Sequence, residues 1–266
     1  MTKGWAVVTG ASSGIGLAFA RELARRGHPV LAVARRRERL EVLSRQAVEG
    51  AGRIEPLSAD LKTEEGLASV VRRVRELGAI ELLVNNAGMA TAGDFFGTDV
   101  VEEIGAIRLN VEAVVMLTYE VLRGMVPSGH GAIINLASVV GFQPFPHFAV
   151  YAASKTFVLS FTEAVAEEVD GTGVRILALC PGSVATEIDV FAHNEGLLGK
   201  LPSLTAEQVV KTGLQALDSG RVVKVVGGLN RFLPFLDRLL PRRTVRWLMG
   251  INAKPPRTLH AAKVGP

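Results

Sequence analysis

Residues 9–16 read Thr9-Gly10-Ala11-Ser12-Ser13-Gly14-Ile15-Gly16, and they follow directly on the apolar stretch Trp5–Thr9. That stretch has the length and composition of a buried strand, and the residues from Ile15 onward have the spacing of a helix. Glycines in a strand-to-helix turn let backbone amides approach a phosphate, and the start of the helix adds positive potential. The stretch therefore predicts a phosphate-binding turn at the start of a βαβ unit.

The glycine spacing in this turn leaves two alternatives open. It is G-x-x-x-G-x-G rather than the commoner dinucleotide fingerprint G-x-G-x-x-G, and a tight turn without a ligand would also suit it. The same residues satisfy G-x-S-x-G, the nucleophile elbow of serine hydrolases. We disfavour a hydrolase because the turn follows the first strand, and because the five histidines show no convincing acid-then-histidine order after it.

Beyond the turn, short β-branched runs alternate with longer segments of helical period. The expected strands are Trp5–Thr9, Val30–Ala34, Ile54–Ser58, Leu82–Asn85, Ala132–Ala137, Arg175–Leu179 and Val222–Val226. The expected helices are Ile15–Arg26, Arg37–Glu49, Glu64–Leu77, Val100–Met125, Ala149–Val169 and Ala206–Asp218. This alternation predicts an α/β fold with a doubly wound parallel sheet of about seven strands, covered by helices on both faces.

Composition favours a single buried core. The 266 residues are 48% hydrophobic, and no linker or repeat divides residues 1–228, which we expect to form one domain. Cys180 is the sole cysteine, so no intrachain disulfide can form, and we expect a packing role for it and a cytoplasmic setting. The first residues show no signal-peptide pattern, and no apolar run approaches the roughly 18 residues that span a bilayer.

Charge is unevenly distributed along the chain. Residues 1–228 carry 22 Lys/Arg against 25 Asp/Glu, whereas residues 229–266 carry eight against one. The basic excess is confined to this tail and lacks a recognisable binding module, so no nucleic-acid partner is expected. The tail places apolar residues among arginines, and Pro234 and Pro241 would divide it into short helices. Such a basic amphipathic extension predicts packing on the body or a sister subunit, which we favour, or peripheral contact with an anionic membrane.

A second polar pattern lies in the expected helix Ala149–Val169, as Tyr151-Ala152-Ala153-Ser154-Lys155. Residues four apart share one face of a helix, so the Lys155 ammonium can lower the pKa of the Tyr151 phenol. A phenol ordinarily titrates near ~10, too high for efficient proton exchange at neutral pH. Such pairs are common on surface helices, and this one gains weight because the glycine turn stands in the same chain.

The residues after the second expected strand predict which nucleotide the turn would hold. In a dinucleotide-binding unit an acid stands about here to bind the ribose 2′-hydroxyl, but this chain reads Arg35-Arg36-Arg37-Glu38-Arg39. Arginine can instead pair with a 2′-phosphate and stack on adenine. A solvated basic helix start is the alternative, slightly unfavourable at the positive end of a helix. We therefore expect NADP(H) to be preferred over NAD(H), with Arg35 as the main contact and Arg36 as the secondary one.

Together these motifs resemble the short-chain dehydrogenase/reductase family, from Trp5 to about Val226. Further matches are Asp60-Leu61, the Asn85-Asn86-Ala87-Gly88 string, and Pro181-Gly182 with Thr186 beyond. The resemblance implies a Rossmann-like fold, an NAD(P)-dependent oxidoreductase and a homodimer or homotetramer paired through the helices near Val100–Met125 and Ala149–Val169. The cofactor contacts expected besides the two arginines are Gly10, Ser12, Ser13, Gly14, Ile15, Gly16, Asp60, Leu61, Asn86, Ala87, Gly88, Tyr151, Lys155, Pro181, Gly182, Val184 and Thr186.

The catalytic residues expected from the resemblance are Asn110, Ser138, Tyr151 and Lys155. Reduction of a carbonyl leaves negative charge on oxygen, which Tyr151 can protonate as a general acid and Ser138 can hydrogen-bond. The resemblance adds that Lys155 binds the nicotinamide ribose and that Asn110 holds a water linking Lys155 to solvent. The alternatives are that Ser138 merely ends a strand and that Asn110 bends a helix. No metal is expected.

The substrate side is aromatic. We expect a pocket formed by Ser138, Phe142, Phe145, Phe148 and Phe191, which suits a lipophilic or bulky carbonyl; alternatively these phenylalanines fill the core or a subunit interface. The main hypothesis is an NADPH-dependent reductase of ketones or aldehydes, reversible with the alcohol. A catalytically silent NADP-binding regulatory or scaffolding protein is the alternative, disfavoured because it would not need all four catalytic residues.

Overall fold

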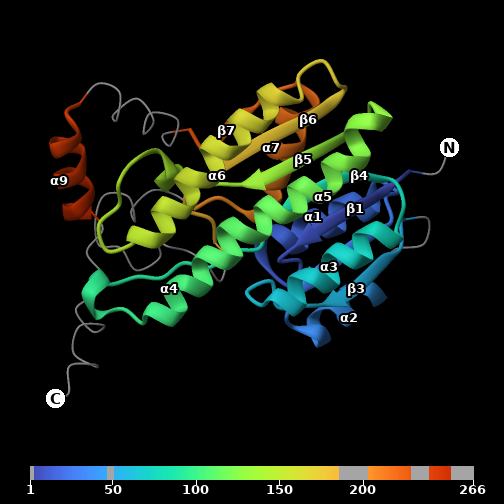
Figure 1. The fold of residues 1–266 in the computed structure, drawn as a ribbon, viewed down its shortest axis with the longest axis horizontal. Helices are drawn as coiled ribbons and strands as arrows, with labels where there is room; N and C mark the ends of the chain where they lie inside the picture. Colours follow the sequence, from blue (N-terminus) through green and yellow to red (C-terminus); the bar gives the residue numbers. More distant parts are fainter. Residues whose placement is uncertain (1–2, 47–50, 186–202, 229–239, 253–266) are drawn as a thin grey trace.

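The computed structural model describes residues 3–46, 51–185, 203–228 and 240–252, and its core is a seven-stranded sheet between two layers of helices (Figure 1). The strand order is β3-β2-β1-β4-β5-β6-β7, and every neighbouring pair is parallel. The strands are β1 (Trp5–Thr9), β2 (Val30–Ala34), β3 (Ile54–Ser58), β4 (Ile80–Asn85), β5 (Gly131–Leu136), β6 (Val174–Pro181) and β7 (Val223–Val226). The predicted doubly wound, Rossmann-like sheet is confirmed.

The helices follow the strands in the predicted alternation. They are α1 (Gly14–Arg25), α2 (Arg37–Arg45), α3 (Glu64–Glu76), α4 (Val100–Ile107), α5 (Ala113–Ser128), α6 (Ala149–Glu168), α7 (Ala206–Asp218) and α9 (Arg242–Asn252). Short 3-10 turns form at Phe95–Gly97 and Val139–Phe142. No helix in these described ranges is long and apolar enough to cross a bilayer.

Alternate residues of the central strands point into two separate cores. Ala6 and Val8 pack in the cluster that contains residues of α1 and α7, whereas Val7 between them packs with α3 and α5. All three side chains are fully buried. A strand covered on both faces needs apolar residues at every position, which is why these strands appear in the sequence as continuous apolar runs.

The strand order reverses between β1 and β4, and this reversal positions the site. The chain runs outward from β1 to β3 and then crosses back to β4 on the other side of β1. The loops after β1 and β4 therefore diverge and leave a crevice at the carboxyl ends of the strands, where ligands of such sheets bind. The glycine turn and Gly88 follow β1 and β4, which border this crevice, and Ser138 and Gly182 follow β5 and β6, the next two strands on the β4 side.

One expected helix differs from the structure. The segment Val100–Met125 is not one continuous α-helix, because the π-helical turn Arg108–Glu112 separates α4 from α5. A π-helical turn adds a residue to the helical repeat and is frequent at functional sites. It lies at Asn110, whose side chain bonds both the N–H and the carbonyl of Met89, at 3.0 and 2.9 Å. Hydrophobic spacing alone does not reveal such a local change.

The basic tail contributes the helix α9. Val245 and Met249 are buried in one cluster with Phe145, Phe148 and Tyr151. Helix α9 thus packs on the body through these two residues, while the choice between packing and membrane contact for the tail as a whole stays a prediction. Residues 229–239 and 253–266 lie outside the described parts of the chain, and the division at residue 228 stays a prediction.

Candidate active site

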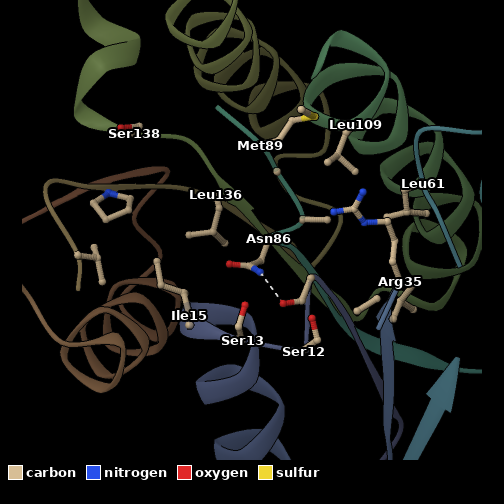
Figure 2. A pocket seen from close by; sticks show the side chains of 18 of the residues that line it. Ser12, Ser13, Ile15, Arg35, Leu61, Asn86, Met89, Leu109, Leu136 and Ser138 are labelled. Atoms are coloured by element: carbon tan, nitrogen blue, oxygen red, sulfur yellow. Dashed lines mark hydrogen bonds between the residues drawn. The ribbon is translucent and has the colours of Figure 1, made fainter. Parts of the chain in front are cut away.

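A cavity of about 430 Å³ opens at the carboxyl ends of the strands (Figure 2). It is lined by residues that lie far apart in the sequence. The predicted site residues that line it are Gly10, Ser12, Ser13, Gly14, Ile15, Arg35, Arg36, Asp60, Leu61, Asn86, Ala87, Gly88, Ser138, Tyr151, Lys155, Pro181, Gly182 and Val184. The structure therefore brings nearly all of the predicted cofactor contacts and three of the four predicted catalytic residues to one cavity.

Seven predicted residues are not found in this lining; three are phenylalanines described below, and the other four behave differently or cannot be placed. Gly16 lies behind the lining, where an added Cβ would come 2.3 Å from the Gly10 carbonyl oxygen, so glycine lets α1 approach the turn. Asn110 is fully buried behind the cavity. Thr186 and Phe191 lie outside the described residues.

The turn after β1 is bound to the turn after β4. The Thr9 hydroxyl accepts hydrogen bonds from the N–H groups of Asn86 and Ala87, at 3.0 and 2.9 Å, and Asn86 Nδ2 donates to the Thr9 carbonyl at 2.9 Å. Gly10 has φ +68°, and an added Cβ there would lie 2.6 Å from Asn86 Nδ2. Sequence reasoning placed Gly10 and Asn86 in the site but missed Thr9, because its role depends on a partner 77 residues away.

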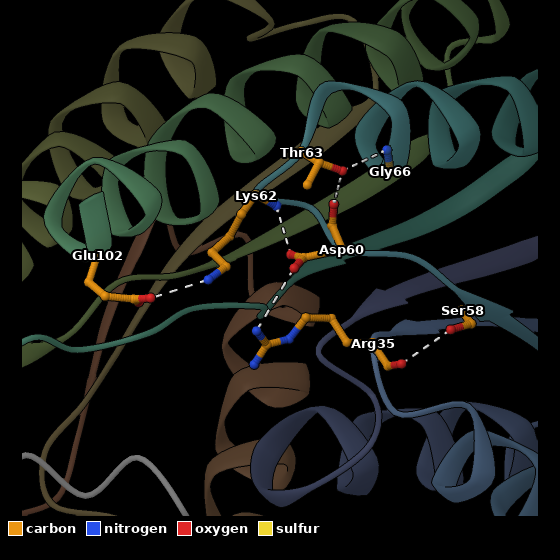
Figure 3. A network of polar contacts seen from close by, with 7 residues as sticks. All are labelled: Arg35, Ser58, Asp60, Lys62, Thr63, Gly66 and Glu102. Carbon is orange, nitrogen blue, oxygen red and sulfur yellow. Dashed lines mark hydrogen bonds and ion pairs between the residues drawn. The ribbon is translucent and has the colours of Figure 1, made fainter.

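The two arginines after β2 hold different positions, and Figure 3 shows Arg35 beside Asp60. Arg36 donates to the hydroxyls of Ser12 and Ser13, with its Nη2 at 3.1 and 2.9 Å, so its guanidinium lies on the glycine turn. Arg35 is more exposed, and its Nη1 lies 3.9 Å from Asp60 Oδ2. The Asp60 carboxylate also accepts from the Lys62 N–H at 3.0 Å. Two guanidinium groups thus stand at the end of the cavity where β2 ends.

The first turns of α6 present the Tyr–Lys pair. Lys155 Nζ donates to the Leu136 carbonyl at 2.7 Å and lies 5.9 Å from the centroid of the Tyr151 ring. Ser138 caps the 3-10 turn that follows β5, with its hydroxyl accepting from the Val140 N–H at 3.4 Å. Asn110 Nδ2 donates to the Ser154 hydroxyl at 3.0 Å, and that hydroxyl donates to the Tyr151 carbonyl at 2.7 Å.

Asn110 and Lys155 meet at Gly88. A Cβ added to Gly88 would lie 3.2 Å from Asn110 Oδ1 and 3.6 Å from Lys155 Nζ, so the backbone there passes close to both polar groups. Sequence reasoning did not assign Ser154, Leu136 or Met89 to the site, although Ser154 stands inside the Tyr–Lys string. Their roles are hydrogen bonds between separate elements, which no local pattern signals.

Burial shifts the titration of two neighbouring side chains. The pKa of Lys155 falls from 10.5 to about 8, because burial removes water from the ammonium; the nearby Cys180 opposes this shift. Cys180 is a buried free thiol, and burial raises its pKa from 9.0 to about 12. Lys155 is therefore a charged group held in a poorly solvated place at neutral pH.

Three of the predicted substrate-pocket residues are not in the cavity lining. Phe145 and Phe148 are buried beneath α9 and pack edge to face with centroids 5.6 Å apart. Phe142 is partly buried against a different cluster, which contains Val158 of α6. For these three residues the structure shows core packing, the alternative that their apolar character left open.

Metal ligands are not gathered in the described parts of the chain, where no group of three or more His, Cys, Asp or Glu side chains could hold an ion.

The family model for short chain dehydrogenase matches residues 4–195. The chain is 33% identical over 244 residues to 17-beta-hydroxysteroid dehydrogenase type 3 of Rattus norvegicus, which covers 90% of this chain and 77% of that protein. It is 38% identical to a short chain dehydrogenase of Pseudocercospora fijiensis, over 69% of this chain but only 60% of that protein.

A similar solved structure is the short-chain dehydrogenase from Sphingobium yanoikuyae in complex with NADPH. The TM-score is 0.79 at 33% sequence identity, and the superposition covers 91% of this chain and 95% of that one. The likeness therefore extends beyond the matched residues 4–195 into the last part of the chain.

The shifted pKa values predict how stability depends on pH. Between pH 8 and 10.5 the unfolded chain keeps a proton on Lys155 that the folded chain has lost, so this residue makes stability rise with pH. Between pH 9 and 12 the folded chain keeps a Cys180 proton that the unfolded chain has lost, so stability falls. In urea unfolding of the cofactor-free protein, the free energy of unfolding should rise from pH 8 to 9 and then level off.

The variant Lys155→Met isolates the lysine contribution. As the pH rises from 8 to 10.5, the free energy of unfolding of the wild type should increase by roughly 3 kcal/mol relative to that of the variant. In the variant Cys180→Ala, the free energy of unfolding should keep rising above pH 9, where that of the wild type levels off. Parallel curves for wild type and Lys155→Met would contradict the assignment of the shift to Lys155.

Proposed function

The chain belongs to the short-chain dehydrogenase/reductase family, and from that membership we propose that it is an NADP(H)-dependent oxidoreductase. It would reduce a ketone or an aldehyde and, in reverse, oxidise the corresponding alcohol. The observation that carries the proposal is the convergence of the glycine turn, Ser138, Tyr151 and Lys155 on one cavity.

The residues around the cavity fit this cofactor. Gly10 and Gly14 hold the left-handed conformations that open the turn, and the N-cap residue Ser13 makes no capping side-chain hydrogen bond to α1, whose first amides could bind a phosphate. Arg35 and Arg36, which follow β2 and line the cavity, are the side chains that we propose to bind the 2′-phosphate. The solved relative from Sphingobium yanoikuyae was obtained in complex with NADPH. When bound, the cofactor supplies the hydride in one direction and accepts it in the other.

The chain's own side chains would handle the proton and the charge. Tyr151 donates its phenolic proton to the substrate oxygen in reduction, and Ser138 gives a second hydrogen bond to the developing negative charge. The Lys155 ammonium, fixed by the Leu136 carbonyl, favours the phenolate that remains. Asn110 holds Ser154, which is bonded to the Tyr151 backbone, so the turn that carries the acid is tied to the π-helical turn.

The proposed substrate is a lipophilic or bulky carbonyl compound. The support is the likeness to a hydroxysteroid dehydrogenase and the apolar residues Met89 and Leu109 in the cavity lining. The alternative, a silent NADP-binding regulatory or scaffolding protein, predicts tight cofactor binding with no turnover on a panel of ketones and aldehydes. The two hypotheses therefore separate in the first activity screen.

We also propose a homodimer or homotetramer in a cytoplasmic setting. The helices α4, α5 and α6 carry exposed apolar residues, among them Ile104, Met116 and Phe157, which a second copy would cover. Peripheral membrane contact by the tail stays a prediction, tested by co-sedimentation with anionic vesicles; no binding by the intact chain would end it.

Replacing Tyr151 with Phe should abolish turnover and leave NADPH binding nearly intact, because the ring remains and only the transferred proton is lost. The matched control is Tyr119→Phe, since Tyr119 is the other tyrosine of the chain and is exposed on α5. The measurements are NADPH oxidation with an active ketone and NADPH affinity by fluorescence. An active Tyr151→Phe variant would refute the role of the phenol.

Titration with NADPH and NADH at matched salt should show NADPH binding at least about tenfold more tightly, since a charge-assisted hydrogen bond contributes about 1.5–3 kcal/mol. The variant Arg35→Ala should remove most of that preference. The control is Arg37→Ala, because Arg37 pairs with Glu41 at 2.9 Å and does not line the cavity. Comparable affinities for the two cofactors in wild type would overturn the arginine argument.

Sedimentation of the purified chain should give a multiple of its 28.3 kDa mass. The double variant Met116→Glu with Phe157→Glu should lower that multiple, because it introduces charge into the proposed interface. A monomeric wild type at micromolar concentration would count against the assembly.

A further inference from the structure

The turn of α6 that carries Tyr151 begins without the usual means of fixing a helix end. Its N-cap residue, Phe148, makes no side-chain hydrogen bond to the helix, and the first turn has no acidic residue. Side-chain caps typically contribute about 1 kcal/mol and satisfy part of the free N–H groups at a helix start. The position of the proposed general acid must therefore be maintained by other contacts.

The segment before this turn, residues 143–148, adopts a conformation that needs support from its surroundings. His147 has φ +65°, and among the described residues no other non-glycine has a positive φ. Such a conformation costs of the order of 1 kcal/mol and persists only where neighbouring contacts impose it. The His147 carbonyl accepts from the Gly93 N–H at 2.8 Å, and its Nδ1 lies 2.8 Å from Asp94 Oδ1, without the alignment of a hydrogen bond.

Helix α9 packs in the same hydrophobic cluster as this segment and Tyr151. Val245 and Met249 are 1% and 5% exposed, and they share one hydrophobic cluster with Phe145, Phe148 and Tyr151. Gly250 brings the helix backbone close to the segment as well, since a Cβ added there would lie 3.5 Å from Pro146 Cγ. In Figure 1, α9 lies apart from the sheet, beside the part of the chain that leads into α6.

Lys155 is fixed separately from this cluster. Its ammonium is bound to the Leu136 carbonyl at the end of β5, whereas Tyr151, one turn earlier, belongs to the hydrophobic cluster that includes Val245 and Met249 of α9. A shift of the first turn of α6 would therefore change the position of the phenol relative to Lys155 and Ser138. Displacement of about 1 Å in a reacting group can cost ~100-fold in rate.

We propose that α9 is a clamp on the first turn of α6, with Met249 and Val245 as positioning residues for Tyr151. The inference rests on the proposed function, in which Tyr151 is the general acid. It goes beyond that function because α9 lies outside the residues 4–195 that the family model matches and contributes nothing to the cavity lining. A basic tail helix would thus set the geometry of the proton donor by packing alone.

The test uses the full-length chain and the variant Met249→Ala. Its matched control is Met125→Ala, because Met125 is an equally buried methionine in α5, packed in the separate cluster beneath α3 and α5. We expect Met249→Ala to lower kcat about 10- to 100-fold while NADPH affinity stays within about twofold. Met125→Ala should lower the Tm at least as much and keep kcat, and the conservative variant Met249→Leu should restore most of the rate.

The opposite results would overturn the proposal. A kcat within twofold of wild type in Met249→Ala, or an equal loss in Met125→Ala, would show that α9 contributes only stability. A raised KM with unchanged kcat would make α9 a wall of the substrate pocket instead. A wild type that reduces no carbonyl would overturn the proposed function and this inference with it. Should Met249→Ala not fold, Val245→Ala makes a smaller deletion in the same cluster and is judged by the same outcomes.

Discussion

The tie between the ends of β1 and β4 is the constraint on which the rest of the site depends. The Thr9 hydroxyl accepts hydrogen bonds from two backbone N–H groups of the turn after β4, and the Asn86 side chain donates a hydrogen bond to the Thr9 carbonyl. The bonds bring the turn of Gly10 against the Asn86–Gly88 backbone so closely that no Cβ fits at Gly10. Backbone atoms of these two turns are thereby brought together at the cavity, and backbone amides at the start of a helix favour phosphate binding.

A chain of buried polar side chains links the strands to α6, the helix that carries Tyr151 and Lys155. Asn85 donates to Asn135 at 2.9 Å, and Asn135 donates to Thr162 of α6 at 3.0 Å, all three residues being almost completely buried. Buried polar groups cost free energy unless every one is bonded, so such a chain favours a single arrangement of β4, β5 and α6. Because Ser138 follows β5 and Tyr151 lies on α6, the same chain relates the two groups that would hold the substrate oxygen.

The energetic cost of the site is concentrated in Lys155. An ammonium almost without water is unfavourable, which is why its pKa falls to about 8, and the hydrogen bond to the Leu136 carbonyl at 2.7 Å compensates part of this cost. The same poor solvation strengthens its interaction with a phenolate nearby, since charges interact more strongly where the effective dielectric constant is low. The strained backbone at His147 adds a smaller cost beside it, and α9 packs over that segment.

The sequence by itself determined the sheet, its parallel order of elements and most of the cavity lining, because these depend on local signals. Apolar runs, helical spacing, three glycines and a Tyr–Lys pair four residues apart each act within a few residues of the chain. Only the tertiary structure decided that the helix through Asn110 contains a π-helical turn, that Phe145 and Phe148 pack in the core, and that α9 joins the same hydrophobic cluster as Tyr151. These features arise from contacts between residues far apart in the chain, and hydrophobic periodicity indicates that a side chain is buried without indicating what it is buried against.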